Sequence, residues 1–262
     1  MPGSLLLLAA VALVAAVGAG LWSRRLWLGL IFTGGLAVLA AAGRVLAGAA
    51  DWEWRSAFAV GGEALHVRLD GLSALFLALV GVVGMAGAVY AGEYWSDERH
   101  PGTAPRGRAW WGALMLSMTG VLLASNGLHF LLAWELFTLS AYFLVTLDRS
   151  RRDAREAGWL YLVASHLGTV ALFAFFAGLA AHTGSWDLGP MREQAGLAPW
   201  FWVALLGFGV KAGMFPLHFW LPSAHAKAPS HVSAMMSGVA IKMGVYGIVR
   251  FSGWLPVPAA AG

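Results

Sequence analysis

The sequence predicts an all-α protein, a polytopic membrane helical bundle of about eight transmembrane helices. Of its 262 residues, 59% are hydrophobic and only 11% are charged, whereas a soluble domain carries about a quarter charged residues. Apolar runs close to 20 residues long recur along the chain, and about 20 residues of helix span the hydrocarbon core of a bilayer. The 34 glycines are scattered through these runs, as expected where helices pack closely in lipid.

Eight predicted spans follow the apolar runs. They cover approximately residues 4–22, 27–49, 71–92, 110–126, 128–147, 157–181, 199–216 with a continuation to about 226, and 230–253. The first run has no Lys or Arg before Arg24, so it lacks the positive region of a signal peptide and is predicted to be the first transmembrane helix. We expect residues 1–70 to form a two-helix segment with an outer loop, and residues 71–253 to form the main membrane domain.

The seventh span is predicted to be broken. Gly207, Gly209 and Gly213 precede Pro216, which lies five residues past Lys211. Proline removes a backbone hydrogen bond and kinks or ends a helix. Broken helices at membrane depth occur where they are buried in protein or line a wet cavity, and their ends often lie at ion sites in transporters. The break at Pro216 therefore indicates an ion site, with a simple packing kink as the alternative.

The basic residues of the loops predict the orientation of the chain. One set of loops carries ten Lys and Arg residues and the other set carries five. Because the more basic loops of a membrane protein lie in the cytoplasm, the pattern places the N-terminus outside the inner (plasma) membrane. The densest basic cluster, DRSRRDARE at 148–156, gives this prediction most of its weight. We expect that cluster to be a solvated loop.

Three ionisable residues inside predicted spans carry the functional prediction. Glu135 is the only one of 13 acidic residues in a span, and Lys211 and Lys242 also lie in apolar sequence. A charge at the centre of a bilayer helix costs roughly 2.5–3.5 kcal/mol on insertion scales, so such residues usually mark an ion path. A Glu135–Lys211 pair would keep both groups ionised, and its separation would favour loss of the lysine's proton. A pair that only clamps two helices together is the structural alternative.

Helical spacing adds candidates for a relay around Glu135. Thr138 and Tyr142 follow it at i+3 and i+7, so the carboxylate and two hydroxyls share one stripe of a helix. His166, on the sixth span, is a candidate intermediate group. A histidine that hydrogen-bonds across helices as part of the packing is an equal alternative for His166.

The eighth span offers a second stretch of relay. His231 lies eleven residues before Lys242, which is three helical turns, and the same predicted face carries Gly238 and Tyr246. The separation is about 16 Å at 1.5 Å per residue, so proton transfer would need waters or intermediate groups. His218, near the turn between the seventh and eighth spans, is a further possible relay group.

The composition argues against a cofactor in this chain. His218, His225 and His231 cluster around the turn, but Pro222 and Pro229 interrupt them, and a metal site needs ligands at characteristic spacings. The absence of cysteine excludes iron–sulfur ligation and disulfides. The sequence also has no Gly-rich nucleotide loop between a strand and a helix. We expect no metal and no cofactor, and the net charge of +4 follows from topology and does not imply nucleic acid.

Three segments resemble one known family. NGLHFLLAWELFTLSAYFLV resembles the fifth helix of the antiporter-like subunits shared by respiratory complex I, the Mrp-type cation/proton antiporters and the energy-converting hydrogenases. VKAGMFPLHFWLPSAHAKAPSHVSAMMSGVAIKMGVYGIVRF resembles their broken seventh helix and their eighth helix, and LVASHLGT is similar to their sixth. The resemblance covers roughly residues 70–253, and PLHFWLPSAHAKAPSHVSAMMSGV looks most like the formate hydrogenlyase and hydrogenase branch.

The resemblance implies roles for the three buried charges. Glu135 matches the key glutamate of the fifth helix, Lys211 the lysine beside the break, and Lys242 the lysine of the eighth helix. In the family these residues form part of a hydrated polar axis along the membrane plane. A change in a redox module alters the glutamate–lysine pairing and drives proton translocation.

The sequence departs from the family in length. Members usually have about 14 helices in two inverted five-helix repeats, whereas this chain has only the first repeat, at about 110–253, followed by a tail at 254–262. This pattern favours a truncated or split product over a second half supplied by a partner, and such a piece should not pump alone.

The leading hypothesis is a proton-translocating subunit of a redox-driven complex. Its expected partners are other membrane subunits, a redox module with iron–sulfur, nickel or flavin centres, and the lipid bilayer. The rival hypotheses are a subunit of an Mrp-type sodium/proton antiporter and a membrane scaffold that transports nothing.

Overall fold

The computed structural model describes residues 2–256 and 258. Within them the chain forms ten α-helices, one 3₁₀ turn, one π-helical turn and one β-hairpin. The α-helices are α1 (Pro2–Trp22), α2 (Arg24–Leu46), α3 (Gly71–Tyr94), α4 (Ala104–Leu123), α5 (Gly127–Val145), α6 (Arg152–Thr183), α7 (Trp200–Ala212), α8 (Leu221–Lys227), α9 (Ser230–Met235) and α10 (Ile241–Trp254). The 3₁₀ turn η1 is Ala195–Leu197 and the π-helical turn η2 is Met236–Ala240.

The predicted membrane bundle is confirmed. Seven helical segments of the described chain are long and apolar enough to cross a membrane: Pro2–Trp22, Arg24–Leu46, Gly71–Tyr94, Gly127–Val145, Arg152–Thr183, Ala195–Ala212 and Ser230–Trp254. The predicted fourth span corresponds to α4, which has 20 residues and is less apolar because Arg106 and Arg108 lie in its first turns. The predicted tail, 254–262, lies mostly outside the described residues.

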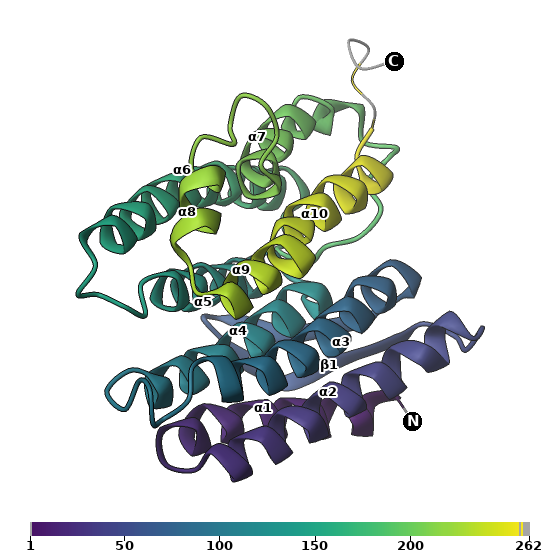
Figure 1. Cartoon of the computed structure of the whole chain (residues 1–262). Helices are drawn as coiled ribbons and strands as arrows, with labels where there is room; N and C mark the ends of the chain where they lie inside the picture. The colour runs from purple at the N-terminus through teal and green to yellow at the C-terminus, as the bar shows by residue number, and fades with distance from the viewer. Residues whose placement is uncertain (1, 257, 259–262) are drawn as a thin grey trace.

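The helices pack as neighbouring antiparallel pairs. Helix α1 packs on α2 and α4, α2 on α3, α4 on α5, and α6 on α7, while α10 returns to lie against α7. Figure 1 shows α1–α4 together in one half of the molecule and α5–α10 in the other, with α4 against α5 between them. Glycine permits the closest of these approaches, since a Cβ on Gly244 of α10 would lie 2.4 Å from the Ala212 nitrogen of α7.

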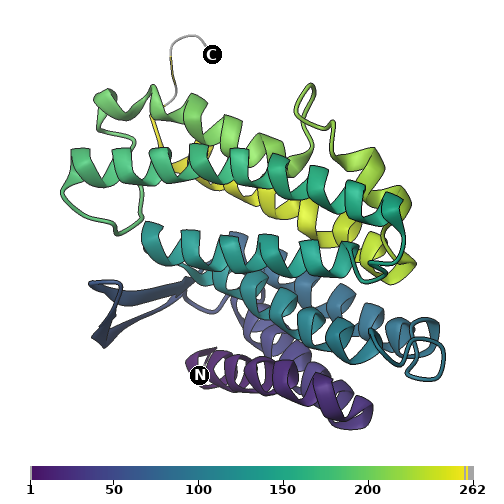
Figure 2. The ribbon, with the colours of Figure 1, turned by 90° about the vertical axis from the view of Figure 1, so that its left-hand side faces the viewer.

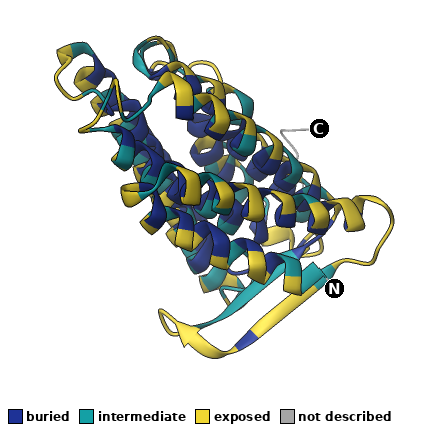
Figure 3. Ribbon diagram, turned by 60° about the horizontal axis from the view of Figure 1, so that its bottom comes forward, coloured by how far each residue is buried: buried dark blue, intermediate teal, exposed yellow. Residues whose placement is uncertain are grey.

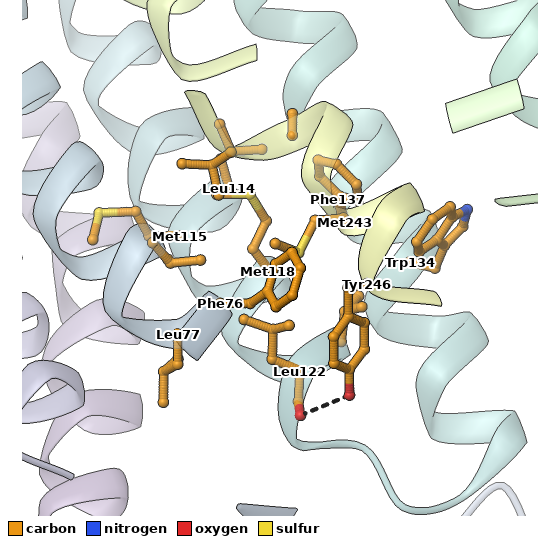
Figure 4. Packing of buried hydrophobic residues seen from close by; sticks show 14 of the residues in the cluster. Phe76, Leu77, Leu114, Met115, Met118, Leu122, Trp134, Phe137, Met243 and Tyr246 are labelled. Atoms are coloured by element: carbon orange, nitrogen blue, oxygen red, sulfur yellow. Dashed lines mark hydrogen bonds between the residues drawn. The ribbon is translucent and has the colours of Figure 1, made fainter. Parts of the chain in front are cut away.

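The bundle has a hydrophobic interior and an apolar exterior. Phe76, Met115, Met118 and Met243 of three different helices meet in the core (Figure 4). Large hydrophobic residues such as Leu7 are exposed, and Figure 3 shows exposed positions recurring along the helices. An apolar exterior of this kind suits a hydrocarbon solvent.

The predicted outer loop contains a β-hairpin that the sequence reading missed. Strand β1 (Trp52–Val60) pairs antiparallel with β2 (Glu63–Leu69), from Trp52 opposite Leu69 to Val60 opposite Glu63. Gly61 and Gly62 form the two-residue connection with φ of +64° and +90°, the backbone that a tight hairpin turn requires. Figure 2 shows the hairpin projecting beside one end of the helices.

The predicted break in the seventh helix is present and begins at Gly213. Helix α7 ends at Ala212, Gly213 adopts φ +67°, and the Phe215–Pro216 peptide is cis before α8 begins at Leu221. The break leaves helix carbonyls without their usual partners. One of these carbonyls, that of Val210, accepts a hydrogen bond from the Trp220 indole N–H at 2.9 Å.

The eighth span is also irregular. Between α9 and α10, the Ile241 N–H donates to the carbonyl of Met236, five residues back, and bypasses that of Ser237. The Lys242 Nζ donates to this Ser237 carbonyl at 2.6 Å. Single π turns of this kind are rare and occur frequently at functional sites.

Candidate functional site

Lys211 lies at the end of α7, directly before the break, and its side chain points into the bundle. The residue is only 3% exposed. Its Nζ donates to the Tyr161 hydroxyl of α6 at 2.6 Å and to the Thr138 hydroxyl of α5 at 3.4 Å. Three helices therefore meet at one ammonium group.

Aromatic rings form the rest of this pocket. The Lys211 Nζ lies 4.1 Å from the ring centre of Phe137, 4.7 Å from that of Tyr161 and 5.8 Å from that of Trp134. A cation over ring faces gains about 2 kcal/mol when both are desolvated. No carboxylate among the described residues lies within 4.0 Å of the Lys211 Nζ.

Glu135 lies one helical turn before Thr138 and faces α6. Its Oε2 is 3.2 Å from the His166 Nε2, and its Oε1 is buried with no hydrogen-bond partner among the described residues. The side chains of Glu135 and His166 are 31% and 45% exposed. This pair is therefore close to the outer surface of the bundle, while the Lys211 pocket is enclosed.

The predicted stripe of polar groups on α5 joins these two clusters. Thr138 contacts Lys211, and Glu135 precedes Thr138 by three residues on the same helix face. Glu135 contacts His166 and does not form the direct ion pair with Lys211 that the sequence suggested. His166, one of the predicted relay groups, is in contact with Glu135.

The sequence predicts Tyr142 as a possible relay group, whereas the described structure places Tyr161 against Lys211. Tyr142 is half-buried and its ring packs against Phe143. Tyr161 is buried on α6, four residues before Ser165 and five before His166. That spacing was a usable signal, since Tyr161 and Ser165 lie on one face of the helix.

Lys242 does not share a face with His231, contrary to the sequence prediction. His231 is buried against α3 and α4, with ring centres 6.0 Å from Tyr94 and 5.6 Å from Trp111. Lys242 instead turns toward the exposed Ser237. The π turn supplies the reason, because one extra residue rotates the following helix by roughly 100°.

The other predicted residues lie near the break. Pro216 follows the cis peptide, and the His218 ring lies 5.7 Å from that of Phe215, with a buried Nδ1 that has no partner in the described chain. His225 Nδ1 lies 3.1 Å from the Ser233 hydroxyl. The described residues include no group of three His, Cys, Asp or Glu side chains that could hold a metal ion.

A buried ion pair that the sequence reading did not identify joins α3 to α10. Arg250 makes two hydrogen bonds to the Asp70 carboxylate, the longer at 2.7 Å, and one to the Ser73 hydroxyl at 2.8 Å. Tyr246 completes the cluster by donating to the Leu122 carbonyl at 3.3 Å (Figure 4). Burial alone would raise the pKa of Asp70, but its bonds to Arg250 and to the Ser73 N–H outweigh this, and the net pKa is lowered.

The chain belongs to a known family. Residues 124–261, more than half of the chain, match the family described as NADH:quinone oxidoreductase/Mrp antiporter, transmembrane. The predicted family resemblance is thereby confirmed, and the protein is an antiporter-like, multi-span membrane subunit.

Curated relatives come from all three predicted branches of the family. Hydrogenase-4 component B of Escherichia coli is 36% identical over 190 residues, covering 71% of this chain and 28% of the relative. NAD(P)H-quinone oxidoreductase chain 4 3 of Picosynechococcus is 34% identical over 71% of this chain and 34% of the relative. Putative antiporter subunit mnhA2 of Staphylococcus aureus is 32% identical over 72% and 24%. The chain thus spans about a third or less of these relatives.

Solved structures share the fold. The membrane-bound sulfane sulfur reductase, an archaeal respiratory membrane complex, contains a chain with a TM-score of 0.74 and 25% identity, covering 95% of this chain and 40% of that one. The Mrp complex from Dietzia contains a chain with a TM-score of 0.80 and 22% identity, covering 95% and 28%. Relatives of this chain are therefore subunits of larger membrane assemblies.

Proposed function

We propose that this chain moves protons as a membrane subunit of a redox-driven complex. In this proposal Glu135 and Lys211 form the switching pair and Lys242 is the onward carrier. The chain would lie in the plasma membrane with its N-terminus outside. It would depend on other membrane subunits for the rest of the path, and on a redox module with iron–sulfur, nickel or flavin centres for energy.

The observation that carries the proposal is the surroundings of Lys211. A buried ammonium is expensive unless it is paired with a carboxylate, yet the described contacts of its Nζ are two hydroxyls and three rings. Lysine can release its proton on desolvation, which arginine cannot. A group held this way suits a site that changes its protonation state.

Glu135 supplies the other half of the switch. Its carboxylate contacts His166 and lies one turn from Thr138, which itself contacts Lys211. Movement of Glu135 toward Lys211 would favour the charged amine, and movement toward His166 would favour loss of its proton. In this proposal a rotation of the Glu135 side chain on α5 would convert one arrangement into the other, so a small change at a subunit contact could select between them.

A sodium/proton antiporter subunit is the second candidate function. The relatives named as putative antiporter subunits support it, and the shared fold with the Mrp complex is compatible with it. In that case no electrons are involved, and Glu135 and Lys211 would couple two ion movements. A scaffold without transport is the third candidate, in which the same groups only hold α5, α6 and α7 together.

The test is Lys211→Ala in the complex purified from its native host and reconstituted in vesicles. We expect loss of proton uptake with electron transfer largely retained. The control is Lys227→Ala on helix α8, whose Nζ contacts Asp153 at 3.1 Å and which should keep normal uptake. Full proton uptake by Lys211→Ala would overturn the proposal. If Glu135→Leu/Lys211→Leu also transports normally, the scaffold explanation would replace it.

A further inference from the structure

A cavity of about 400 Å³ lies between the start of α4 and the end of α5, away from the Lys211 pocket. The loop after α5 closes one side of it. Arg106 of α4 and Arg149 of the loop both line this cavity, with the Thr103 hydroxyl beside them. Within the described chain neither guanidinium has a carboxylate partner, since the ion pairs of this region involve other arginines.

The cavity has a polar rim and an apolar wall. Trp110 and Phe143 stack at 4.2 Å between ring centres and form the wall deeper along the two helices. Arg149 lies over the outer end of this stack, with its guanidinium carbon 5.3 Å from the ring centre of Phe143. The stacking leaves the Arg149 N–H groups free to donate to an anion.

The loop that carries Arg149 is held in place. Arg155 of α6 donates to the Arg149 carbonyl at 2.5 Å and to the Ser150 carbonyl at 3.2 Å. Asp148 also lines the cavity, but its Oδ1 accepts from the Ser150 hydroxyl at 2.5 Å. The lining carries a net positive charge, because Arg106 and Arg149 outnumber the single carboxylate of Asp148.

We propose that this cavity binds the phosphate of an anionic phospholipid, with an acyl chain along the Trp110–Phe143 wall. Two guanidiniums suit a phosphate diester because each can donate two parallel hydrogen bonds. Basic pockets between transmembrane helices at the membrane surface take up anionic head groups in this way. The apolar wall distinguishes a lipid from a free phosphate, which would gain nothing from it.

The test is native mass spectrometry of the detergent-purified chain, titrated with phosphatidylglycerol or with phosphatidylcholine of the same acyl chains. We expect phosphatidylglycerol to bind about tenfold more tightly, because both lipids offer the same phosphate but the two guanidiniums repel the choline cation of phosphatidylcholine. Arg106→Gln/Arg149→Gln should abolish this preference. Arg99→Gln should retain it, since Arg99 is exposed on the same side and lies outside the cavity lining.

Equal binding of the two lipids would overturn the proposal. Competition by millimolar inorganic phosphate against phosphatidylglycerol would also overturn it, because the site would then be a simple anion site. A diazirine-labelled phosphatidylglycerol gives a second readout on the unmodified chain. Cross-links concentrated at residues 103–110 and 143–150 support the proposal, and cross-links spread evenly along the helices contradict it.

Discussion

The Lys211 ammonium donates a 2.6 Å hydrogen bond to the Tyr161 hydroxyl, and no closer polar contact of Lys211 is present among the described residues. Lys211 ends the first half of a broken helix, and Tyr161 lies on the neighbouring helix α6. The pair therefore joins the break to the helix that also carries His166. A change in the charge on Lys211 would therefore act directly on the hydrogen bond to this hydroxyl.

Removal of that hydroxyl should slow proton movement. Tyr161→Phe keeps the ring contact but deletes the acceptor for Lys211. We expect the rate of proton uptake by the intact complex to fall about tenfold, which corresponds to the loss of a hydrogen bond that contributes roughly 1.4 kcal/mol. Electron transfer should be retained. The matched control is Tyr142→Phe, whose ring packs on Phe143 and has no described contact with Lys211. Equal effects of the two substitutions would remove Tyr161 from the account.

The Asp70–Arg250 pair should be required for stability. Arg250→Leu leaves the buried Asp70 carboxylate without its main partner, and breaking a buried pair costs about 3–5 kcal/mol. We expect a clearly lower midpoint of thermal unfolding in detergent, followed by intrinsic tryptophan fluorescence. Asp70→Leu/Arg250→Leu should recover part of the loss. Arg44→Leu, an exposed position at the end of α2, serves as the control, and a midpoint for Arg250→Leu equal to that control would contradict the assignment.

Acid should release the β-hairpin from the loop that follows α6. Asp187 in that loop contacts Arg55 of β1 and lies 3.3 Å from the His66 Nδ1 of β2. Burial raises the pKa of Asp187, but the bonds to Arg55 and His66 outweigh it, and the net pKa falls below the usual 3.8. The contribution to stability is therefore complete above about pH 4. It is lost as the pH falls through the folded pKa.

The measurement is hydrogen exchange of the hairpin amides as a function of pH, corrected for the intrinsic exchange rate. Protection of residues 52–69 should decrease below about pH 4 in the native chain. Asp187→Asn should show lower protection at neutral pH and a weaker decrease in acid. A native-like decrease in Asp187→Asn would show that another group carries the acid response.

The sequence was sufficient to predict the elements that depend on residues close together in the chain. Apolar runs gave the spans to within a few residues for most helices, and the glycines and Pro216 gave the break in the seventh helix. The hairpin was missed because β1 is mostly exposed and β2 is mostly only partly buried, so the apolar signal is weak there. The Gly61–Gly62 pair nevertheless provided a usable signal for a hairpin turn.

The site could be predicted only in part from the sequence, because its geometry depends on contacts between helices. Periodicity put Thr138 on the face of Glu135, as observed, but it could not show that Tyr161 of another helix meets Lys211. The π turn was invisible to a fixed helical period, so the relation of His231 to Lys242 was wrong. Asp70 and Arg250 are 180 residues apart, and only the packing of α3 against α10 brings them together.

The most direct test of the central claim is proton uptake by the intact complex carrying Lys211→Arg. Arginine keeps the positive charge and can contact Tyr161 and Thr138, but it does not release its proton in proteins. If Lys211 changes its protonation state during turnover, this variant should lose proton uptake as fully as Lys211→Ala while electron transfer continues. Normal uptake by Lys211→Arg would show that Lys211 supplies only a fixed charge, and the proposed relay would be wrong.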